Sequence, residues 1–393
     1  CMKFKSGDEK NLFGKSSLQP VAAAMLTRGT KTMTRSEIED RMTELKMAGS
    51  ITNFTTTRKN LPAALELVFD VMHNSIMPQD EFDQFKKQMQ VMIESMRDKP
   101  DALAQNAITQ HFNTYPKGDP RHEYSLDESL EQLNRLTVDQ VRAFYKEFGG
   151  TSRGEISIVG DFDPKAVEKI IRDDYAKYVS KAHYAPIVTE YRPVQATRVV
   201  IDTPDKENAT IVARSVFPIN DTSPDAPALT VANWILGGGT GLSNRLIERL
   251  RQKEGLSYGA GSHVRIPEKG DNGSFVFRAI VAPQNMLQAE ASARDVIAKA
   301  IKDGFTDQEV EEAKKGLLQA MQVARSQDDV VARSWNDKME NQRTWVFSKK
   351  QAEAISKLTT ADVNAALRKY IKPDEITFVL AGDQKKAAQK KQD

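Results

Sequence analysis

Two side chains that could do chemistry, Arg251 and Tyr258, stand seven residues apart in the stretch RLRQKEGLSYGAG. The arginine offers a permanently charged fork of N–H donors, and the tyrosine offers a neutral phenolic donor, so together they could bind carbonyl oxygens and oxyanions. The residues alone leave a structural alternative open. Arg251 could be a favourable charge at a helix C-terminus, and Tyr258 could be a strand aromatic in the core. Between them, Gly255 is placed to end a helix.

The elements that must position this pair follow from hydrophobic periodicity and turn residues in the second part of the chain. We predict strands Arg198–Thr203 and Ala209–Pro218, helix Pro224–Leu236, a glycine loop, helix Ser243–Glu254, strands near Leu256–Arg265 and Ser274–Val281, three or four helices, and a closing strand Glu375–Leu380. Consecutive strands with short turns, and helices grouped together, indicate an α+β fold with mainly antiparallel sheets.

The sequence contains a long-range repeat. LTVDQVRAFYKEF from Leu136 aligns with LTTADVNAALRKYI from Leu358, and ISIVGD aligns with ITFVLAGD, both at an offset of 222. Each copy reads as a Thr-capped amphipathic helix followed by a buried strand that ends in Gly-Asp. DEFDQFKKQMQVMIESMRDKPDALA from Asp80 matches QEVEEAKKGLLQAMQVARSQDDVVA from Gln308, each predicted as a long helix. AAAMLTRGT from Ala22 matches VANWILGGGT.

The repeat predicts two homologous domains, residues 1–185 and residues 186–393. Their boundary falls in HYAPIVTEYRPVQATR, an aperiodic stretch bracketed by Pro186 and Pro193. An offset of 210 places strand Ala209–Pro218 on residues 1–8 and strand Arg198–Thr203 before residue 1. The first copy is therefore expected to lack its first strand. Either this domain is naturally shorter or the chain is the tail of a longer polypeptide, and we favour the second alternative.

Composition restricts the classes of partner. The chain has 393 residues, 39% of them hydrophobic and 28% charged, and a net charge of +2, as in a soluble globular protein. Because basic and acidic residues are mixed along the chain, we predict no nucleic-acid-binding face. No apolar run in the sequence is nearly long enough to span a membrane. The lysine-rich C-terminus reads as a solvated tail, and the one cysteine, Cys1, excludes an internal disulfide framework. The compartment is not predicted, although a signal peptide upstream would make the protein periplasmic.

With these residues in view, the chain resembles the pitrilysin and insulinase family of inverted zincins along essentially its whole length. In that family, paired α+β domains close like a clamshell around a peptide, and one pair carries the zinc motif H-x-x-E-H before a Met-Leu-x-x-Gly-Thr turn. The turn is present here as MLTRGT, but the five motif positions are Pro20, Val21, Ala22, Ala23 and Ala24. Because zinc needs nitrogen, oxygen or sulfur ligands, we predict no metal site in this chain.

Other candidate ligands read as structural. The family's third ligand would correspond to Glu94, which alone is a solvated helix carboxylate. No two of the five histidines lie within ten residues of each other, so a helical i, i+4 pair is excluded, and His122 reads as a surface loop residue. The loop LGGGTGLSNRL lacks the lysine and glycine spacing of nucleotide sites. Ser243 is expected to cap the helix that follows it.

The second copy matches the non-zinc half of the family in the pattern R-x-x-x-G-L-x-Y. The resemblance implies that Tyr258 and Arg251 are catalytic, reaching across the closed clamshell to the zinc of a homologous partner half. Tyr258 would stabilise the oxyanion of amide hydrolysis, and Arg251 would bind substrate carbonyls and orient the phenol. Gly255 and Gly259 would permit close approach of the bound peptide.

The first hypothesis is therefore the zinc-free half, or companion subunit, of a zinc metalloendopeptidase that binds peptide and hydrolyses nothing by itself. A second hypothesis is a non-enzymatic scaffold or peptide-binding subunit of the same fold. A third is an independent metalloprotease with an unrecognised site, which stoichiometric zinc in the purified chain would support.

Overall fold

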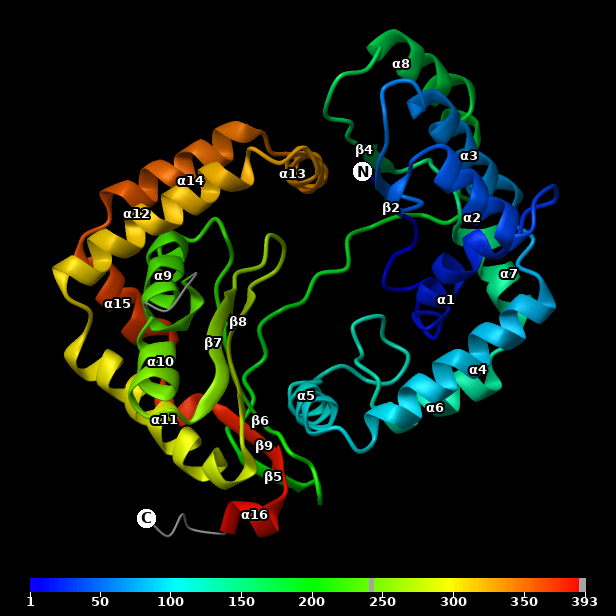
Figure 1. Ribbon diagram of the computed structural model, residues 1–393. Helices are drawn as coiled ribbons and strands as arrows, with labels where there is room; N and C mark the ends of the chain where they lie inside the picture. Colours follow the sequence, from blue (N-terminus) through cyan, green and yellow to red (C-terminus); the bar gives the residue numbers. More distant parts are fainter. Residues whose placement is uncertain (240–243, 389–393) are drawn as a thin grey trace.

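The computed structural model describes residues 1–239 and 244–388 (Figure 1). For reference, the first half denotes residues 1–185 and the second half residues 186–393. The elements of the first half are β1 Met2–Phe4, α1 Leu18–Met25, η1 Leu26–Arg28, α2 Arg35–Glu44, β2 Ala48–Ser50, β3 Asn53–Thr55, α3 Leu61–Asn74, α4 Gln79–Met96, α5 Pro100–His111, α6 Leu126–Arg135, α7 Val138–Phe148, β4 Gly154–Ile156, α8 Pro164–Asp173 and η2 Tyr175–Lys177.

The second half holds one five-stranded sheet in the order β5-β9-β6-β8-β7. Every pair in it is antiparallel except β5 with β9, so the fold is α+β, as predicted. Its elements are β5 Arg198–Asp202, β6 Ala209–Pro218, α9 Ala226–Asn233, η3 Trp234–Gly238, α10 Arg245–Ile247, η4 Glu248–Lys253, β7 Ser257–Arg265, β8 Asn272–Val281, η5 Pro283–Asn285, α11 Met286–Asp303, α12 Asp307–Ala324, α13 Asp328–Glu340, α14 Trp345–Lys357, α15 Thr360–Tyr370, η6 Pro373–Glu375, β9 Thr377–Gly382 and α16 Gln384–Ala388.

One face of this sheet packs against helices to form the main core. Phe275, Phe277 and Phe378 point into that core and are almost completely buried. Helices α9, α12, α14 and α15 cover this side in Figure 1. The apolar alternation of β6 and β8 explains why one face of each strand is buried there.

The repeat in the sequence recurs as matching helices. Helices α4 and α12 both have 18 residues, and their starts differ by 228, the offset between the matching stretches from Asp80 and Gln308. Helices α7 and α15 both begin with a threonine capping box, Thr137 with Gln140 and Thr359 with Asp362. The predicted threonine caps are therefore confirmed.

Two predictions about helices were wrong. The stretch from Asp80 and the stretch from Gln308 each form two helices, because the chain turns at 97–99 and at 325–327. Pro100 explains the first break, since proline is favoured at the first position of a new helix. The segment 282–376 consequently contains five α-helices, where the sequence analysis expected three or four.

The strands of the first half are much shorter than predicted. Strand β1 pairs with β4, and strand β2 pairs with β3 in a separate short hairpin. The predicted strand ISIVGD is regular only as far as Ile156, and its last rung joins Ser157 to Cys1. Residues 158–161 have no strand beside them in the described structure, so they do not continue the ladder. The equivalent strand β9 pairs on both sides, with β5 and with β6.

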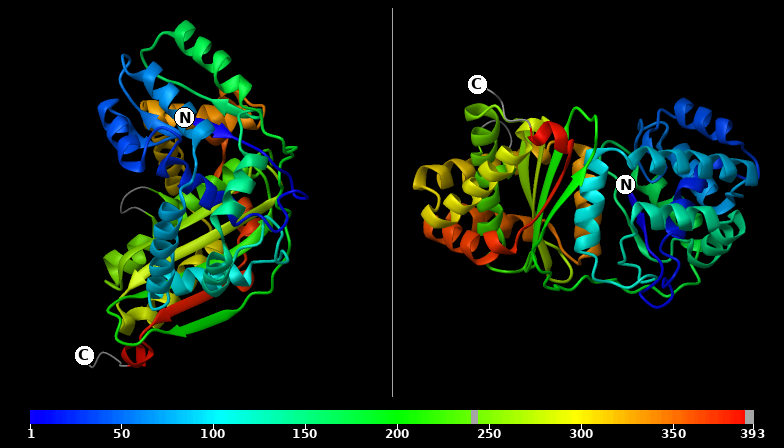
Figure 2. Two further views of the ribbon diagram at one scale, coloured as in Figure 1. Left: turned by 90° about the vertical axis from the view of Figure 1, so that its right-hand side faces the viewer. Right: turned by 90° about the horizontal axis from the view of Figure 1, so that it is seen from below.

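The two halves exchange equivalent helices. Helix α5 of the first half packs on the sheet of the second half, where Ala104 and Ile108 contact Val212 and Val379. Helix α13 of the second half packs against β4 of the first half, and the buried Asn336 hydrogen-bonds Ser157 and Cys1. Figures 1 and 2 show α5 beside the sheet and α13 beside β4. Because the starts of α5 and α13 differ by 228, the same offset as those of α4 and α12, the exchange is reciprocal.

Candidate functional site

A π-helix, η4, presents Arg251 to solvent. Its end is fixed by two contacts of Glu254, which pairs with Arg249 and accepts a hydrogen bond of 2.6 Å from the Ser292 hydroxyl of α11. Gly255 follows with φ +61°, a left-handed conformation that favours glycine, and so it ends the helix as predicted. Arg251 forms no ion pair with any residue that the structure describes, and its side chain is exposed.

A β-bulge at the start of β7 presents Tyr258. Ser257 pairs with Val281 and Gly259 pairs with Ile280, so Tyr258 is the extra residue between two consecutive rungs. Its side chain is 65% exposed and therefore lies outside the hydrophobic core. Bulges commonly re-aim a side chain next to active sites. The structural alternative for Tyr258, a buried strand aromatic, is thus wrong.

The glycines beside Tyr258 leave open backbone. A Cβ atom at Gly255 or at Gly259 would meet nothing within 4 Å, and Gly259 is exposed. A Cβ atom at Gly261 would approach the carbonyl oxygen of Gly237 to 3.2 Å. The structure therefore leaves room for another chain beside Gly255 and Gly259, as close backbone approach requires.

A second π-helix, η3, packs against β7 from the helical side of the sheet. Just before η3, Asn233 at the end of α9 contacts β7, because the Ser262 hydroxyl donates to Asn233 Oδ1 at 2.8 Å. Helix α10 begins at Arg245, and Asn244 caps it by accepting from the Ile247 amide at 2.9 Å. The predicted cap, Ser243, lies outside the described residues. π-Helices are rare and are frequent at functional sites, and here two of them contact the strand that carries Tyr258.

An ion pair ties this region to the helical layer. Arg245 on α10 pairs with Glu309 on α12, with a distance of 2.7 Å between Nε and Oε1. Burial opposes ionisation of Glu309, but the hydrogen bond from Arg245 lowers its pKa overall. The carboxylate therefore stays ionised at neutral pH and fixes α10, the helix that continues into η4.

The positions of the absent zinc motif lie on helix α1 in the first half. Val21 and Ala22 are buried, whereas Pro20, Ala23 and Ala24 are exposed. None of these side chains carries a nitrogen, oxygen or sulfur ligand, so they do not fit a zinc ion. Within residues 1–239 and 244–388, no group of three or more His, Cys, Asp or Glu side chains could hold a metal ion.

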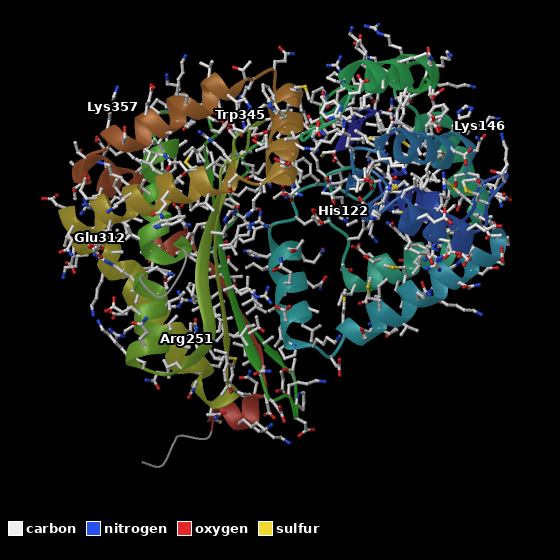
Figure 3. All side chains as sticks on the ribbon, turned by 45° about the horizontal axis from the view of Figure 1, so that its top comes forward. His122, Lys146, Arg251, Glu312, Trp345 and Lys357 are labelled. Atoms are coloured by element: carbon white, nitrogen blue, oxygen red, sulfur yellow. The ribbon has the colours of Figure 1, made fainter. Side chains whose placement is uncertain are left out.

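The remaining candidate ligands are engaged in other contacts. Glu94 is exposed and pairs with Arg97 at 2.9 Å, as expected of a solvated helix carboxylate. His122 lies in a loop, but the prediction that it is a surface residue was wrong. Its ring Nδ1 lies 2.7 Å from the Tyr115 carbonyl oxygen, and its side chain is only 9% exposed. Figure 3 shows His122 in the first half, far from Arg251.

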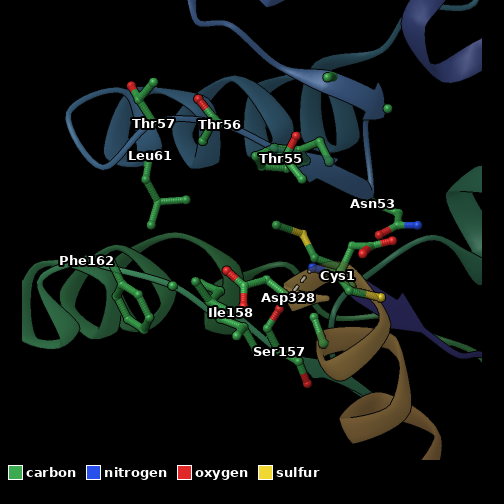
Figure 4. Close-up of a pocket in the computed structure, with 18 of the residues that line it drawn as sticks. Cys1, Asn53, Thr55, Thr56, Thr57, Leu61, Ser157, Ile158, Phe162 and Asp328 are labelled. Atoms are coloured by element: carbon green, nitrogen blue, oxygen red, sulfur yellow. Dashed lines mark hydrogen bonds between the residues drawn. The ribbon is translucent and has the colours of Figure 1, made fainter. Parts of the chain in front are cut away.

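The cavity of about 570 Å³ in Figure 4 lies elsewhere, between the first half and helix α13. Residues 53–58 and 157–162 line it, together with Cys1 and Asp328. It contains none of the residues that the sequence analysis selected. Its walls are the ends of the short strands β3 and β4, and it is therefore separate from the Arg251 and Tyr258 region.

Comparison with known proteins agrees with this architecture. The family model described as Peptidase M16 inactive domain matches residues 135–317. An uncharacterized zinc protease of Mycobacterium tuberculosis is 25% identical over 261 residues, 66% of this chain and 57% of that protein. The protein named Non-peptidase homolog YmxG of Helicobacter pylori is 23% identical over 185 residues, 46% of this chain and 41% of that protein. In sequence, the chain is therefore similar to peptidase M16 proteins.

Solved structures show the same fold. The peptidase M16 inactive domain from Pseudomonas fluorescens superposes with a TM-score of 0.82 at 21% identity, covering 97% of this chain and 92% of that chain. The periplasmic protease PqqL of Escherichia coli gives 0.68 at 14% identity, covering 96% of this chain but 42% of that longer chain. Likewise, the chain spans 57% of the length of the uncharacterized zinc protease of Mycobacterium tuberculosis. The family model that matches is described as an inactive domain, and the solved structures show that this chain shares their fold.

No helix in the described parts of this chain combines the length and the apolar character that a transmembrane segment needs.

Sequence reasoning missed one feature, Arg214 on the buried strand β6. Its Nε atom is buried without a hydrogen-bond partner, and its guanidinium lies 4.8 Å from the ring centre of Phe112. The available signal was an arginine inside the apolar run ATIVARSVF.

Proposed function

We propose that this chain is the zinc-free half of an M16 metalloendopeptidase and that it lends Tyr258 and Arg251 to a homologous half that carries zinc. The observation that carries the proposal is the joint exposure of the two side chains, one on a π-helix and one on a β-bulge, next to the open glycine backbone. Two such local irregularities at one place favour a functional role over a structural one.

The chemistry follows from amide hydrolysis. Zinc in the partner would polarise the scissile carbonyl, and the tetrahedral intermediate places negative charge on the former carbonyl oxygen. Tyr258 would donate its phenolic hydrogen to that oxygen. One such donor typically contributes about 3 kcal/mol to transition-state stabilisation. Arg251, with no ion pair of its own among the described residues, would hold substrate carbonyl oxygens through its N–H fork.

Gly255 and Gly259 would receive the peptide backbone, since neither position would bring a Cβ atom within 4 Å of a neighbour. In this proposal the first half supplies no chemistry of its own. Its part is to pack α5 against the sheet that carries β7.

The test is peptide turnover by the chain mixed with its zinc-bearing partner. Tyr258→Phe should lower kcat about 100-fold with little change in KM, because the donor acts on the transition state. Arg251→Gln should raise KM, and Lys253→Gln on the same π-helix, which pairs with Glu248, is the matched control. Turnover that is unchanged in Tyr258→Phe would remove Tyr258 from the mechanism.

A second candidate is a non-enzymatic scaffold or peptide-binding subunit of the same fold, favoured by the similarity to a non-peptidase homologue. It predicts peptide binding with no effect of Tyr258→Phe on any partner's turnover.

A further inference from the structure

The sheet of the second half has one face that its helices do not cover. Arg214 on β6 and His263 on β7 both stand opposite Val276 on β8, so the three residues share one rung. Residues directly opposite in antiparallel strands lie on the same face. Val276 packs with the cluster that includes α5, which places this rung on the face turned toward the first half. Arg265 lies two residues beyond His263 and therefore on the same face.

Arg214 is a cation without a counter-charge. It forms no ion pair within the part of the chain that the structure describes, and its Nε atom is buried and unpartnered. Burial lowers the pKa of Arg214, and the nearby charge of Arg265 lowers it further. A buried, uncompensated charge destabilises a fold, so its presence calls for a reason other than stability.

The surrounding charges do not neutralise this face. Glu123 favours the charged form of Arg214 but is exposed and makes no ion pair with it among the described residues. Asp101 on α5 is already paired with Arg278. Arg265 and His263 are exposed on the same strand, and Arg265 forms no ion pair in the described structure. The face therefore carries a net positive charge that is open to solvent along β7.

A bare strip of backbone leads from this charge to Tyr258. Gly259 and Gly261 occupy the same face of β7 as His263, and neither has a side chain. Strand β7 is the edge of the sheet (Figure 1). From Gly259 to Arg265 the strand rises about 20 Å at roughly 3.4 Å per residue. An extended peptide along the strip would place a residue near Arg265 about six positions from a residue near Tyr258.

We propose that this strip binds an extended peptide substrate that carries acidic side chains, and that Arg214 and Arg265 select a carboxylate about six residues from the cleaved bond. The inference rests on the proposed function and adds the substrate class. Charge complementarity defines the occupant, because a carboxylate offers the two acceptors that an arginine fork binds best. In this proposal, the scissile bond of the peptide lies near Tyr258, and the selected carboxylate lies near Arg214 and Arg265.

Binding to the isolated chain tests the charge requirement without any partner half. The probes are two fluorescent 14-residue peptides of extended, β-branched sequence, one with two glutamates and one with glutamines in their place. We expect the acidic peptide to bind at least about tenfold more tightly, with the difference reduced in Arg265→Gln. Arg135→Gln, an exposed α6 arginine paired with Glu131, removes the same charge elsewhere and should leave binding unchanged. Equal affinity for the two peptides would overturn the proposal.

Arg214→Met separates a binding role from a structural one. Methionine keeps the apolar contact with Phe112 and removes the buried charge, so the midpoint of urea unfolding should stay the same or rise, while affinity for the acidic peptide falls about tenfold. A lower midpoint with unchanged affinity would overturn the proposal. A single-stranded oligonucleotide of equal charge that binds as tightly as the acidic peptide would also overturn it.

This result is distinguishable from failure of the proposed function. If Tyr258→Phe does not change turnover but the chain still selects the acidic peptide, the peptide-binding strip is supported and the catalytic role of Tyr258 is contradicted. If Tyr258→Phe slows turnover of the acidic and the glutamine peptide alike, and the two peptides bind equally, the catalytic role of Tyr258 is supported and the peptide-binding strip is contradicted.

Discussion

The two halves keep equivalent helices but differ in their sheets. Helices α4 and α12 have the same length, and α7 and α15 have the same capping box. In contrast, β7 and β8 form a long ladder, while the corresponding hairpin β2–β3 has three residues in each strand. The helical layer is therefore sufficient to preserve the arrangement of the first half, and the extended sheet is retained where an edge strand presents Tyr258.

The exchanged helices show how the same position can serve different surfaces. Ile108 on α5 and Asn336 on α13 are equivalent at the offset of 228, and both are buried. Ile108 meets the apolar face of a complete sheet. Asn336 meets the open end of a short strand pair, where Ser157 and Cys1 present polar groups. The shorter sheet therefore selects a polar side chain at the same site of the repeat.

The largest expected effect on this comparison comes from Ile108→Ala. Removing the buried side chain leaves a cavity between α5 and the sheet and should lower the free energy of unfolding by about 3 kcal/mol. Urea denaturation followed by far-UV circular dichroism measures it. Ile76→Ala, at a side chain that is 44% exposed, is the control and should change little. A similar loss in both variants would show that α5 does not dock through Ile108.

Asn336→Ala should cost somewhat less, about 2 kcal/mol, because it leaves the polar groups of Ser157 and Cys1 buried without their partner. The same denaturation experiment applies. Arg333→Ala on the same helix removes only an exposed pair with Asp329 and should have an effect near zero. Unchanged stability of Asn336→Ala would break the proposed equivalence of the two docking sites.

The capping boxes sharpen the comparison further. Thr137→Ala and Thr359→Ala each remove one side-chain acceptor from a helix N-terminus and should each lower stability by about 1 kcal/mol. Thr137→Ser and Thr359→Ser, which keep the oxygen, should retain most of it. A large difference in stability between the two alanine variants would mean that the repeated cap does not stabilise both halves equally.

The smallest expected effect is on the stability of the protein at acidic pH. The hydrogen bond from Lys117 lowers the pKa of Glu128 to about 2, below its ordinary value of 4.5. Because the folded pKa is the lower one, this carboxylate stabilises the first half fully above pH 4.5, and the contribution is lost as the pH falls toward 2. Glu128→Gln should flatten the loss of stability between those pH values. Glu353→Gln on α14, whose contact with Lys349 is 3.9 Å long, is the control and should leave the acid limb unchanged.

Much of the helical framework could be predicted from sequence because its signals are local. Threonine caps and a 3.6-residue period depend on residues within a few positions of each other, and the positions of α7, α12 and α15 agree with them. The breaks before α5 and α13 were missed, since the amphipathic pattern continues across both turns. The short strands of the first half were missed as well, because strand length depends on a partner far away in the chain.

The candidate site divides in the same way. The spacing of Arg251, Gly255 and Tyr258 was visible in the sequence, and so was the conformation that Gly255 must adopt. The bulge that turns Tyr258 outward depends on the register between β7 and β8, which no local pattern specifies. The unpaired charge of Arg214 also depends on tertiary structure, because a strand pattern does not reveal which charged groups face it.

The sequence by itself determined the α+β class, the repeat, the helix caps and the absence of zinc ligands at Pro20 to Ala24. These properties follow from residue type and short spacing. Only the tertiary structure decided that α5 and α13 cross between the halves, that Tyr258 is exposed, and that Arg214 and Arg265 share one face of the sheet. Those outcomes depend on contacts between residues more than a hundred positions apart or on strand register, which local chemistry leaves free.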